Sequence, residues 1–381
     1  MKNKVAIILG TRPEAIKLIP IYLELKKSTN FEPILISTGQ HASMLQQIFL
    51  FFSIKPDFEL EVMTQNQTLP ILTAKLFEEL SLHFDKHKYD FVIVQGDTTT
   101  AFVGAVSALY YKYTIVHVEA GLRTHDKSAP FPEESNRKMI ASVADIHFAA
   151  TQMAVDNLYQ ENITKNVALV GNSVIDSLLI ARQKIENNLG VYEKRFLDII
   201  DPNKKLILVT AHRRESFGKG FEQICLALTT IAKEHPECQI LYPVHLNPNL
   251  QSVVHSLLSD VDNIRLIAPL PYDDLVYLMS KSWLILTDSG GIQEEAPTFN
   301  VPLIVMRNTT EREEGLISGC SLLGGTDAKT ILAQFYKVFN SQEVYYRMAS
   351  AENPYGDGMT SKKIVDFLEK YFLKNKSQAN L

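Results

Sequence analysis

Short apolar runs alternate with longer amphipathic segments along almost the whole chain, and this alternation limits the possible folds more than any other feature. Val5–Leu9 and Phe91–Val94 are two such runs in the first half of the sequence. A second series begins at Leu206–Val209 and reaches Leu303–Val305. Runs of this length are typical of buried strands, and strands that alternate with helices predict parallel sheets covered by helices on both faces.

The length of the chain predicts more than one domain. Because 381 residues are too many for one ordinary hydrophobic core, we expect two doubly wound α/β domains. The alternation pauses at Val167–Asn172, just before a long helical stretch. We therefore place an N-terminal domain at residues 1–170 and a C-terminal domain at residues 171–358. The other runs interpreted as strands are Pro33–Ser37, Ile115–Val118, Ile240–Tyr242, Ile264–Leu266 and Trp283–Leu286.

Composition excludes several classes of function. A net charge of −5 makes the chain a poor ligand for polyanions, so we expect neither nucleic acid nor an anionic membrane as a partner. Cys225, Cys238 and Cys320 lack Cys-x-x-Cys spacing, which argues against a disulfide framework or a zinc site. The run Val5–Leu9 is too short for a signal segment or a membrane span, so we expect a cytoplasmic protein.

A Gly-Gly turn follows the predicted strand that ends at Leu286. The turn residues are Ser289, Gly290 and Gly291, and the Ile-Gln-Glu-Glu-Ala pattern after them predicts a helix. Free backbone N–H groups and the positive end of a helix dipole then point at one place, which suits a phosphate. Glu294 and Glu295, one turn into the helix, are placed to accept hydrogen bonds from hydroxyl groups of the same ligand. A phosphate beside a sugar hydroxyl describes a nucleotide.

Three carboxylates follow strands of the first domain. Asp97 comes after Phe91–Val94, Glu119 comes after Ile115–Val118, and Glu133 lies in a proline-flanked segment further on. Ligands of doubly wound sheets bind at the carboxyl ends of strands, so these side chains could converge on one rim. Crowded carboxylates raise one another's pKa, as general acid–base chemistry near neutral pH requires. The alternative is that Asp97 caps a helix and that Glu133 only suits a first helical turn.

Cations also follow the predicted strands. Arg12 and Lys17 lie just after the first strand, in a sequence that is neither a dinucleotide fingerprint nor a P-loop. His212 follows Leu206–Val209 and precedes two arginines, and Arg312 follows a later strand. These positions favour binding of an anion, although solvated charges at a plain helix start remain an alternative for the first pair. We find no convincing metal-ligand spacing.

Seven motifs span almost the whole chain in this order: Gly10–Lys17, Gly96–Thr100, His117–Thr124, Pro132–Arg137, His212–Gly218, Thr287–Ala296 and Asn353–Gly358. Together they resemble the motifs of the non-hydrolysing UDP-N-acetylglucosamine 2-epimerases. The resemblance implies the GT-B fold, in which two Rossmann-like domains face a central cleft and a C-terminal helix, here residues 359–376, returns to the first domain. It also implies a homodimer.

The resemblance further implies a reaction and roles for residues. UDP-N-acetylglucosamine is inverted at C2 to UDP-N-acetylmannosamine through elimination and re-addition of UDP, with no cofactor and no metal. The acid–base carboxylates would be Asp97, Glu119 and Glu133, with the residue that removes the proton left open. The groups that stabilise the departing diphosphate would be Arg12, Lys17 and His212. The nucleotide contacts would be Ser289, Gly290 and Gly291 for the diphosphate, Glu295 for the ribose and Arg312 in the same neighbourhood.

Some positions depart from the family pattern. Leu270 and Leu275 stand where relatives often place Gln and Phe around the uracil, and Ala42 replaces the arginine of a Gln-His-Arg motif.

Other functions stay open for the same motifs: a hydrolysing epimerase that releases UDP and N-acetylmannosamine, an epimerase of a UDP-2,3-diacetamido sugar, a GT-B glycosyltransferase, and a sensor that binds without turnover.

Overall fold

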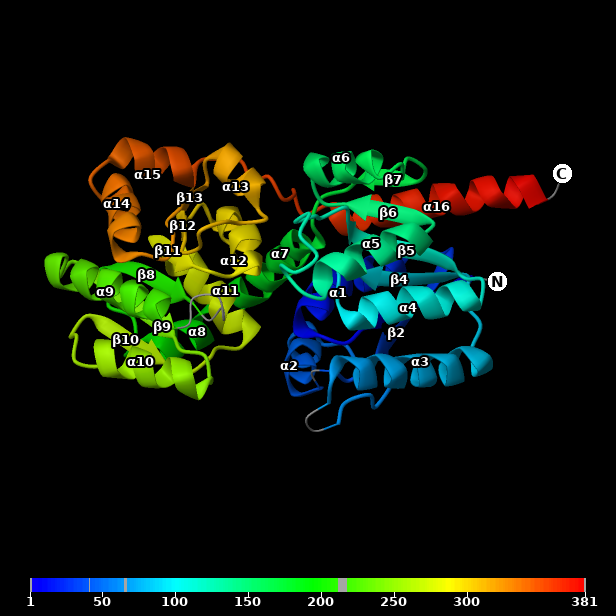
Figure 1. Cartoon of the computed structure of the whole chain (residues 1–381), viewed down its shortest axis with the longest axis horizontal. Helices are drawn as coiled ribbons and strands as arrows, with labels where there is room; N and C mark the ends of the chain where they lie inside the picture. The colour runs from blue at the N-terminus through cyan, green and yellow to red at the C-terminus, as the bar shows by residue number, and fades with distance from the viewer. Residues whose placement is uncertain (1, 41, 65–66, 212–217, 380–381) are drawn as a thin grey trace. The chain divides into compact units, whose positions relative to one another are not determined.

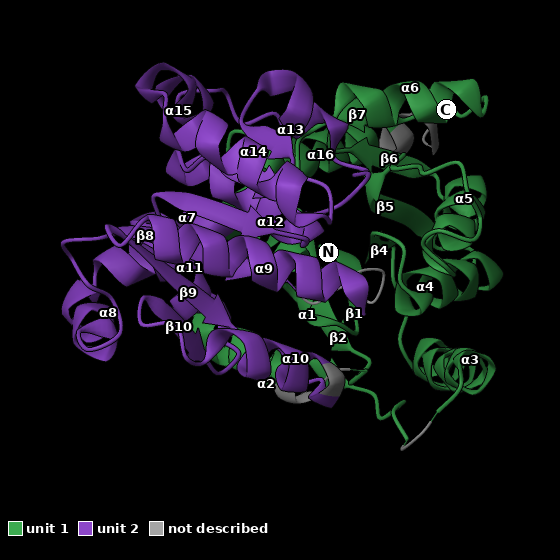
Figure 2. Cartoon of the chain, turned by 60° about the vertical axis from the view of Figure 1, so that its left-hand side comes forward, with its two compact units in different colours: residues 1–177, 355–381 green, residues 178–354 purple. Residues whose placement is uncertain are grey.

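The chain forms two compact units in a computed structural model that describes residues 2–40, 42–64, 67–211 and 218–379 (Figures 1 and 2). The N-terminal unit contains residues 1–177 and 355–381, and the C-terminal unit contains residues 178–354. Each unit is a parallel sheet covered by helices, which confirms the α/β class predicted from the alternating pattern.

The N-terminal unit is built on a seven-stranded sheet with the order β3-β2-β1-β4-β5-β6-β7. Its strands are β1 (Asn3–Leu9), β2 (Phe31–Ser37), β3 (Phe58–Glu59), β4 (Phe91–Gln95), β5 (Thr114–Ala120), β6 (Ile146–Ala149) and β7 (Val167–Leu169). Its helices are α1 (Arg12–Lys27), α2 (Ala42–Phe52), α3 (Leu69–Lys86), α4 (Thr99–Tyr110), α5 (Glu133–Val143), α6 (Gln152–Gln160), the first part of α7 (Ser173–Glu186) and α16 (Thr360–Ala379).

The C-terminal unit is built on a six-stranded sheet with the order β10-β9-β8-β11-β12-β13. Its strands are β8 (Lys205–Thr210), β9 (Cys238–Pro243), β10 (Ile264–Ile267), β11 (Leu284–Thr287), β12 (Leu303–Val305) and β13 (Ser321–Leu323). Its helices are the rest of α7, α8 (Leu189–Phe196), α9 (Lys219–Glu234), α10 (Pro248–Leu258), α11 (Tyr272–Lys281), α12 (Gly290–Glu295), the 3-10 helix η2 (Ala296–Phe299), α13 (Glu313–Ser318), α14 (Ala328–Phe339) and α15 (Gln342–Ala349).

Strand order places the polar loops of each unit. In the N-terminal unit the strand order runs outward from β1 to β3 and then continues on the other side of β1 with β4. The strand order therefore reverses between β1 and β4, and the loops that follow these two strands lead to opposite sides. In the C-terminal unit the same reversal lies between β8 and β11. Doubly wound sheets bind ligands at such points, at the carboxyl ends of the strands.

The strands of both sheets are apolar because both of their faces are covered. Val5–Leu9 in β1 is fully buried residue by residue, and Leu284–Leu286 in β11 is buried in the same way. A continuous apolar run rather than an alternating one is what a parallel strand between two helical layers requires. Every run interpreted as a strand from the sequence therefore appears as one, whereas β3, β6, β7 and β13 are short and were not predicted as strands.

The division between the units lies a few residues from the predicted boundaries. Helix α7 begins in the N-terminal unit because Ser173 donates a hydrogen bond to the Lys17 carbonyl at 2.6 Å and Ser177 donates one to the Ile16 carbonyl. Where the chain returns to the N-terminal unit, the Asn172 N–H donates to the Tyr355 carbonyl at 2.7 Å. The first unit therefore extends to residue 177 and resumes at residue 355.

The final helix, α16, belongs to the N-terminal unit, where it packs against α1. Asp176 accepts hydrogen bonds from the Thr360 N–H at 3.2 Å and the Ser361 N–H at 2.7 Å, so a carboxylate holds the first N–H groups of this helix. Among the described helices, none is long and apolar enough to cross a membrane. The three cysteines are buried and free.

Helix α9 provides a test of the C-terminal core. Leu228 is fully buried against the sheet, whereas Leu226 on the same helix is 52% exposed. We expect Leu228→Ala to lower the free energy of unfolding by about 2–5 kcal/mol, because it leaves a cavity in a packed core. The control Leu226→Ala should lower it by only about 0.5 kcal/mol. Urea denaturation followed by circular dichroism measures both, and equal losses would contradict this description of the core.

Candidate active site

Glu119 and Lys17 form a buried ion pair at the carboxyl edge of the N-terminal sheet. The Lys17 Nζ lies 2.6 Å from Glu119 Oε1, and the two side chains are only 10% and 11% exposed. Gln95, at the end of β4, donates to the other carboxylate oxygen. Glu119 has a φ of +63°, and the pairing of β5 with β6 shifts register between Val118 and Ala120, so this residue leaves the regular ladder.

Asp97 follows β4 and is held by the first turns of α5. Arg137 donates to Asp97 Oδ2 from Nε at 2.8 Å and from its terminal nitrogen at 2.7 Å. The Asn136 side chain donates to the Asp97 backbone carbonyl at 2.8 Å. Charge-assisted bonds of this kind fix orientation as well as charge, and the Asp97 side chain remains 24% exposed.

Glu134 is a second carboxylate that binds Arg137. Its fully buried carboxylate accepts hydrogen bonds from the Thr124 N–H at 3.0 Å, the His125 N–H at 3.1 Å and Arg137 at 3.0 Å. Burial acts to raise the pKa of Glu134, but the Thr124 N–H and Arg137 outweigh burial and lower the pKa. Arg137 is therefore shared between a buried carboxylate and a partly exposed one.

Glu133 differs from the other two predicted carboxylates. It is the first residue of α5, and its Oε2 is buried with no hydrogen-bond partner among the described residues. Asp97 and Glu119, by contrast, each contact a cation. The structure thus places all three predicted carboxylates at the loops and helix start beyond β4 and β5, with different surroundings.

The start of helix α1 already carries an anion of its own. Glu14 accepts hydrogen bonds from the Gly10 N–H at 3.1 Å and the Thr11 N–H at 2.8 Å. These two donors therefore face a side chain of the same helix start. Arg12 has no ion-pair partner among the described residues, so any anion at this loop would meet its guanidinium rather than these two N–H groups.

A buried histidine supports the loop that precedes Asp97. The His117 Nε2 lies 2.8 Å from the Gly96 carbonyl, which requires the proton on Nε2, and Gly96 itself has a φ of +70°. Burial, with His147 and Arg123 nearby, lowers the pKa of His117 to about 3 despite this hydrogen bond. His147, opposite it on β6, has its pKa lowered by burial to about 4. Both histidines are neutral at neutral pH.

In the C-terminal unit, the Gly-Gly turn forms as predicted between β11 and α12. The Thr287 hydroxyl lies 2.6 Å from the Thr210 hydroxyl of β8, and it accepts from the Ser289 N–H at 2.9 Å. The turn is therefore fixed to the two central strands of this sheet. A side chain at Gly290 would meet the Arg312 guanidinium, whose Cζ lies 3.2 Å from the position of a Cβ.

Arg312 lies over this turn in an ion-paired state. It donates to Glu294 Oε1 at 2.9 and 3.0 Å and to Glu311 Oε1 at 2.6 Å. Arg312 thus lies beside the Gly-Gly turn, and Glu294 and Glu311 share its charge. Glu295 lies beside Tyr272 at the start of α11, and burial, together with this carboxylate, raises the pKa of Tyr272 well above its ordinary value.

Some predicted residues cannot be placed, and some contacts were not predicted. His212 lies outside the described residues, as does His41 of the Gln-His-Ala sequence. Arg137 and Glu14 both lie inside recognised motifs, but their partners were not predicted from the sequence. The only signal for Arg137 was its position one helical turn after Glu133 and Glu134.

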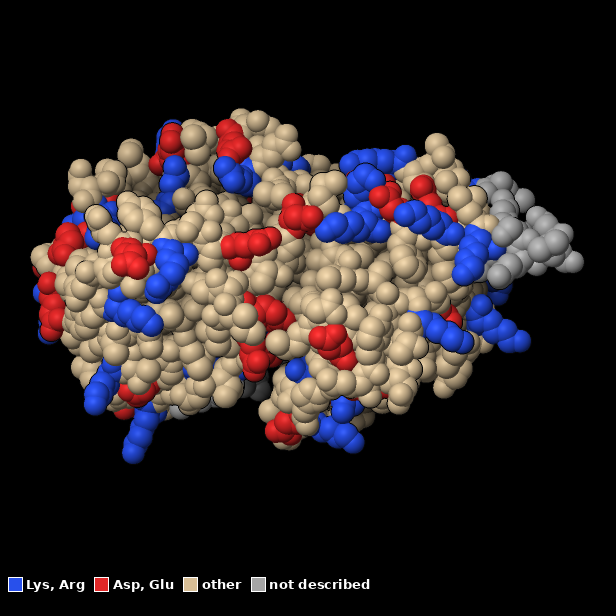
Figure 3. Space-filling model, turned by 90° about the horizontal axis from the view of Figure 1, so that it is seen from above, with Lys and Arg blue, Asp and Glu red and all other residues tan. Residues whose placement is uncertain are grey.

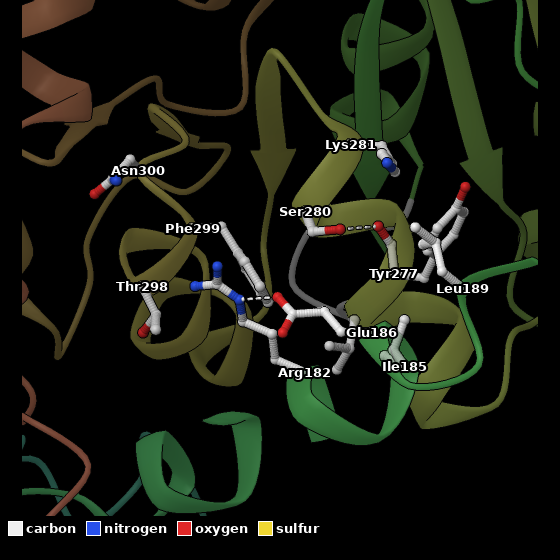
Figure 4. A pocket seen from close by; sticks show the side chains of 11 residues that line it. Arg182, Ile185, Glu186, Leu189, Tyr277, Ser280, Lys281, Thr298, Phe299 and Asn300 are labelled. Atoms are coloured by element: carbon white, nitrogen blue, oxygen red, sulfur yellow. Dashed lines mark hydrogen bonds and ion pairs between the residues drawn. The ribbon is translucent and has the colours of Figure 1, made fainter. Parts of the chain in front are cut away.

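One face of the surface and one cavity of the C-terminal unit lie away from the predicted site residues or show no concentration of one charge. The face drawn in Figure 3 carries acidic and basic side chains interspersed over the described residues, with no continuous patch of one sign. A cavity of about 340 Å³ in the C-terminal unit is lined by side chains from α7, α11 and η2 (Figure 4). There the Arg182 side chain pairs with Glu186 at 2.8 Å, and none of the predicted site residues lines the cavity. Among the described residues, no group of three or more His, Cys, Asp or Glu side chains is placed to hold a metal.

Two Rossmann-like domains, one with a carboxylate cluster and one with a glycine turn at a helix start, define a two-domain protein of the GT-B class. A glycosyltransferase structure from Rickettsia africae shares this fold, with a TM-score of 0.65 at 13% identity over 98% of this chain and 99% of that one. The family follows from the sequence: a family model described as UDP-N-acetylglucosamine 2-epimerase matches residues 23–369, and the chain belongs to this family.

Individual relatives agree over nearly full length. The chain is 46% identical to a UDP-N-acetylglucosamine 2-epimerase of Campylobacter jejuni over 97% of this chain and 98% of the relative. It is 42% identical to the UDP-GlcNAc 2-epimerase of Neisseria meningitidis, whose crystal structure was solved with UDP-GlcNAc bound. That structure has a TM-score of 0.92 and covers 96% of this chain and 100% of the other. The predicted family and the predicted GT-B fold are confirmed.

The two buried histidines predict how stability depends on pH. Their pKa values in the folded chain lie below the ordinary value of about 6.5, so the unfolded chain binds more protons than the folded chain in this range. Their contribution to stability is complete above about pH 6.5 and falls with acidification, at about 1.4 kcal/mol per pH unit per histidine. We expect His147→Asn to reduce by that amount the slope of unfolding free energy between about pH 6 and about pH 5. Equal slopes in urea titrations of both proteins would contradict the neutral, buried state.

Proposed function

We propose that this chain catalyses the reversible C2 epimerisation of UDP-N-acetylglucosamine to UDP-N-acetylmannosamine, with UDP eliminated and then added back. The observation that carries the proposal is the membership of nearly the whole chain in the UDP-N-acetylglucosamine 2-epimerase family. The carboxylates at the edge of the N-terminal sheet support it, because an elimination and a re-addition both need groups that remove and deliver protons.

Residues of the N-terminal unit are proposed to transfer the protons. The C2 proton of the sugar is not acidic, so cleavage of the bond to UDP accompanies its removal and leaves a glycal-like intermediate. Asp97, Glu119 and Glu133 are the proposed acid–base groups, and protonation of the opposite face at C2 inverts the centre. Asp97 is oriented by Arg137 and Glu119 by Lys17, which supports a fixed geometry for both.

Residues of the C-terminal unit are proposed to bind the nucleotide. The backbone N–H groups at Ser289, Gly290 and Gly291 are proposed to bind the diphosphate at the start of α12. Glu295 is proposed to bind the ribose, and Arg312 to support the turn from its position over Gly290.

Three further cations are proposed to stabilise UDP as it leaves. The charge on the diphosphate grows as the bond to C1 breaks, and fixed positive groups then lower the barrier. Arg12 and His212 take this role directly, and Lys17 adds a positive charge while it holds Glu119. As proposed, the reaction needs neither a redox cofactor nor a metal ion.

The proposal includes a homodimer and a cytoplasmic location. The free, buried cysteines support a reducing compartment, because disulfides persist mainly in oxidising compartments. Gel filtration with light scattering would measure the oligomeric state directly.

Proton NMR of the purified protein with UDP-N-acetylglucosamine in deuterium oxide tests the activity. We expect deuterium at C2 together with the appearance of UDP-N-acetylmannosamine. Release of UDP and free N-acetylmannosamine would instead show a hydrolysing enzyme. Absence of exchange and turnover would contradict the proposal and favour a diacetamido sugar substrate, a glycosyltransferase or a sensor.

Asp97→Asn tests the carboxylate chemistry. We expect C2 exchange to fall by about a hundredfold or more, because the amide cannot act as an acid or a base, while UDP affinity stays nearly unchanged. Asp145→Asn is the matched control: Asp145 accepts the Ile115 N–H at 2.8 Å at the opposite, amino edge of the same sheet. Exchange in Asp97→Asn at the rate of this control would remove Asp97 from the mechanism.

A further inference from the structure

We propose that Glu14 is a positioning residue that joins two candidate catalytic loops of the N-terminal unit through one hydrogen bond to Thr98. One loop follows β1 and carries Arg12, and the other follows β4 and carries Asp97. This inference rests on the proposed function, since it concerns how those two residues are held for the same reaction.

Glu14 is a buried acceptor that serves both loops. Its side chain is 1% exposed. Oε2 accepts from the Gly10 N–H, the Thr11 N–H and the Thr11 hydroxyl at 3.1, 2.8 and 2.7 Å. Oε1 accepts from the Thr98 hydroxyl at 2.7 Å. Three contacts are local to the helix start, and the fourth reaches a residue 84 positions away in the sequence.

The loop after β4 is held residue by residue by three different elements. Gly96 accepts through its carbonyl from His117 of β5, and Asp97 is bound by Asn136 and Arg137 of α5. Thr98 is the third consecutive residue, and Glu14 of α1 holds it. Through Thr98, helix α1 therefore also fixes this loop.

The four donors explain why the group is a glutamate, because only a carboxylate has two oxygens that both accept. Burial raises the pKa of the Glu14 carboxyl, and hydrogen bonds from Thr98, Thr11 and Gly10 limit that rise without cancelling it. The carboxylate also faces the positive end of helix α1, which favours a negative charge. Glutamine has the same size but replaces one acceptor oxygen with a donor, so it cannot receive all four donors.

The bond between Glu14 and Thr98 sets the distance between the two loops. Arg12 is two residues from Glu14, and Asp97 is one residue from Thr98. If the bond between Glu14 and Thr98 is lost, the two loops can move apart by small distances, and misplacement of about 1 Å can reduce a rate by about a hundredfold. Glu14 itself need not touch the substrate for this effect.

Thr98→Val is the sharpest test because valine matches threonine in shape but has no hydroxyl. We expect kcat for C2 exchange to fall by about tenfold to a hundredfold, with KM changed by less than about threefold. Thr98→Ser restores the hydroxyl and should restore kcat. Thr98 is also the N-cap of α4, where its oxygen accepts the Ala101 N–H at 3.0 Å, so the loss of a cap needs its own control.

Thr151→Val supplies that control. Thr151 is the N-cap of α6 in the same unit and accepts the Ala154 N–H at 3.3 Å, and its hydroxyl has no bond to Glu14. We expect this variant to keep the kcat of the wild-type protein. An equal loss of kcat in Thr151→Val and Thr98→Val would overturn the proposal, because it would show only the effect of a missing cap.

A double variant tests whether Glu14 and Thr98 act through one contact. If they do, Thr98→Val combined with Glu14→Ala should lose no more kcat than Glu14→Ala alone, because alanine removes the acceptor of the Thr98 hydroxyl. Losses that multiply, or full kcat in Thr98→Val, would overturn the proposal. The wild-type protein distinguishes a failure of the proposed function from a failure of this inference. If the wild-type protein shows no C2 exchange, the proposed function is contradicted. If the wild-type protein exchanges normally and Thr98→Val does so too, only this inference is contradicted.

Discussion

The burial of both faces of the two parallel sheets is the constraint on which the rest of the structure depends. Strands such as β1 and β11 have no exposed side chain in their central residues, so they cannot carry polar chemistry along their length. Polar groups appear instead where the strands end, and parallel strands bring those ends to one edge. The ion pair of Glu119 with Lys17 and that of Asp97 with Arg137 both lie at this edge of the N-terminal sheet.

The polar groups at that edge are partly shielded from water, so their orientation depends on their contacts with one another. Arg137 divides its donors between Asp97 and the buried Glu134, and Glu14 collects four donors from two loops. In such surroundings an unpaired charge is costly, so charged groups are held by one another in a single arrangement. Glu133 is different because its Oε2 has no partner in the described part of the chain. A substrate group is a natural partner for that oxygen under the proposed function.

Much of this could be predicted from the sequence. The central strands were predicted because continuous apolar runs have few alternatives once turn signals bound them, as at Trp283–Leu286 before the Gly-Gly turn. Short strands such as β3, with two residues, carry too little pattern to be detected. The sequence predicted which residue types stand at the strand ends, but it did not predict the contact between Lys17 and Glu119. Arg312 was expected as a further cation and is shared by Glu294 and Glu311.

The sequence by itself determined the α/β class, the family and the loops that carry polar residues, because these depend on local pattern and on motifs read along the chain. The tertiary structure alone decided which polar groups meet. Lys17 and Glu119 are 102 positions apart, Asp97 and Arg137 are 40 apart, and Glu14 and Thr98 are 84 apart. A hydrogen bond requires two atoms within about 3 Å of each other. Strand order and register set that distance, and spacing along the sequence does not.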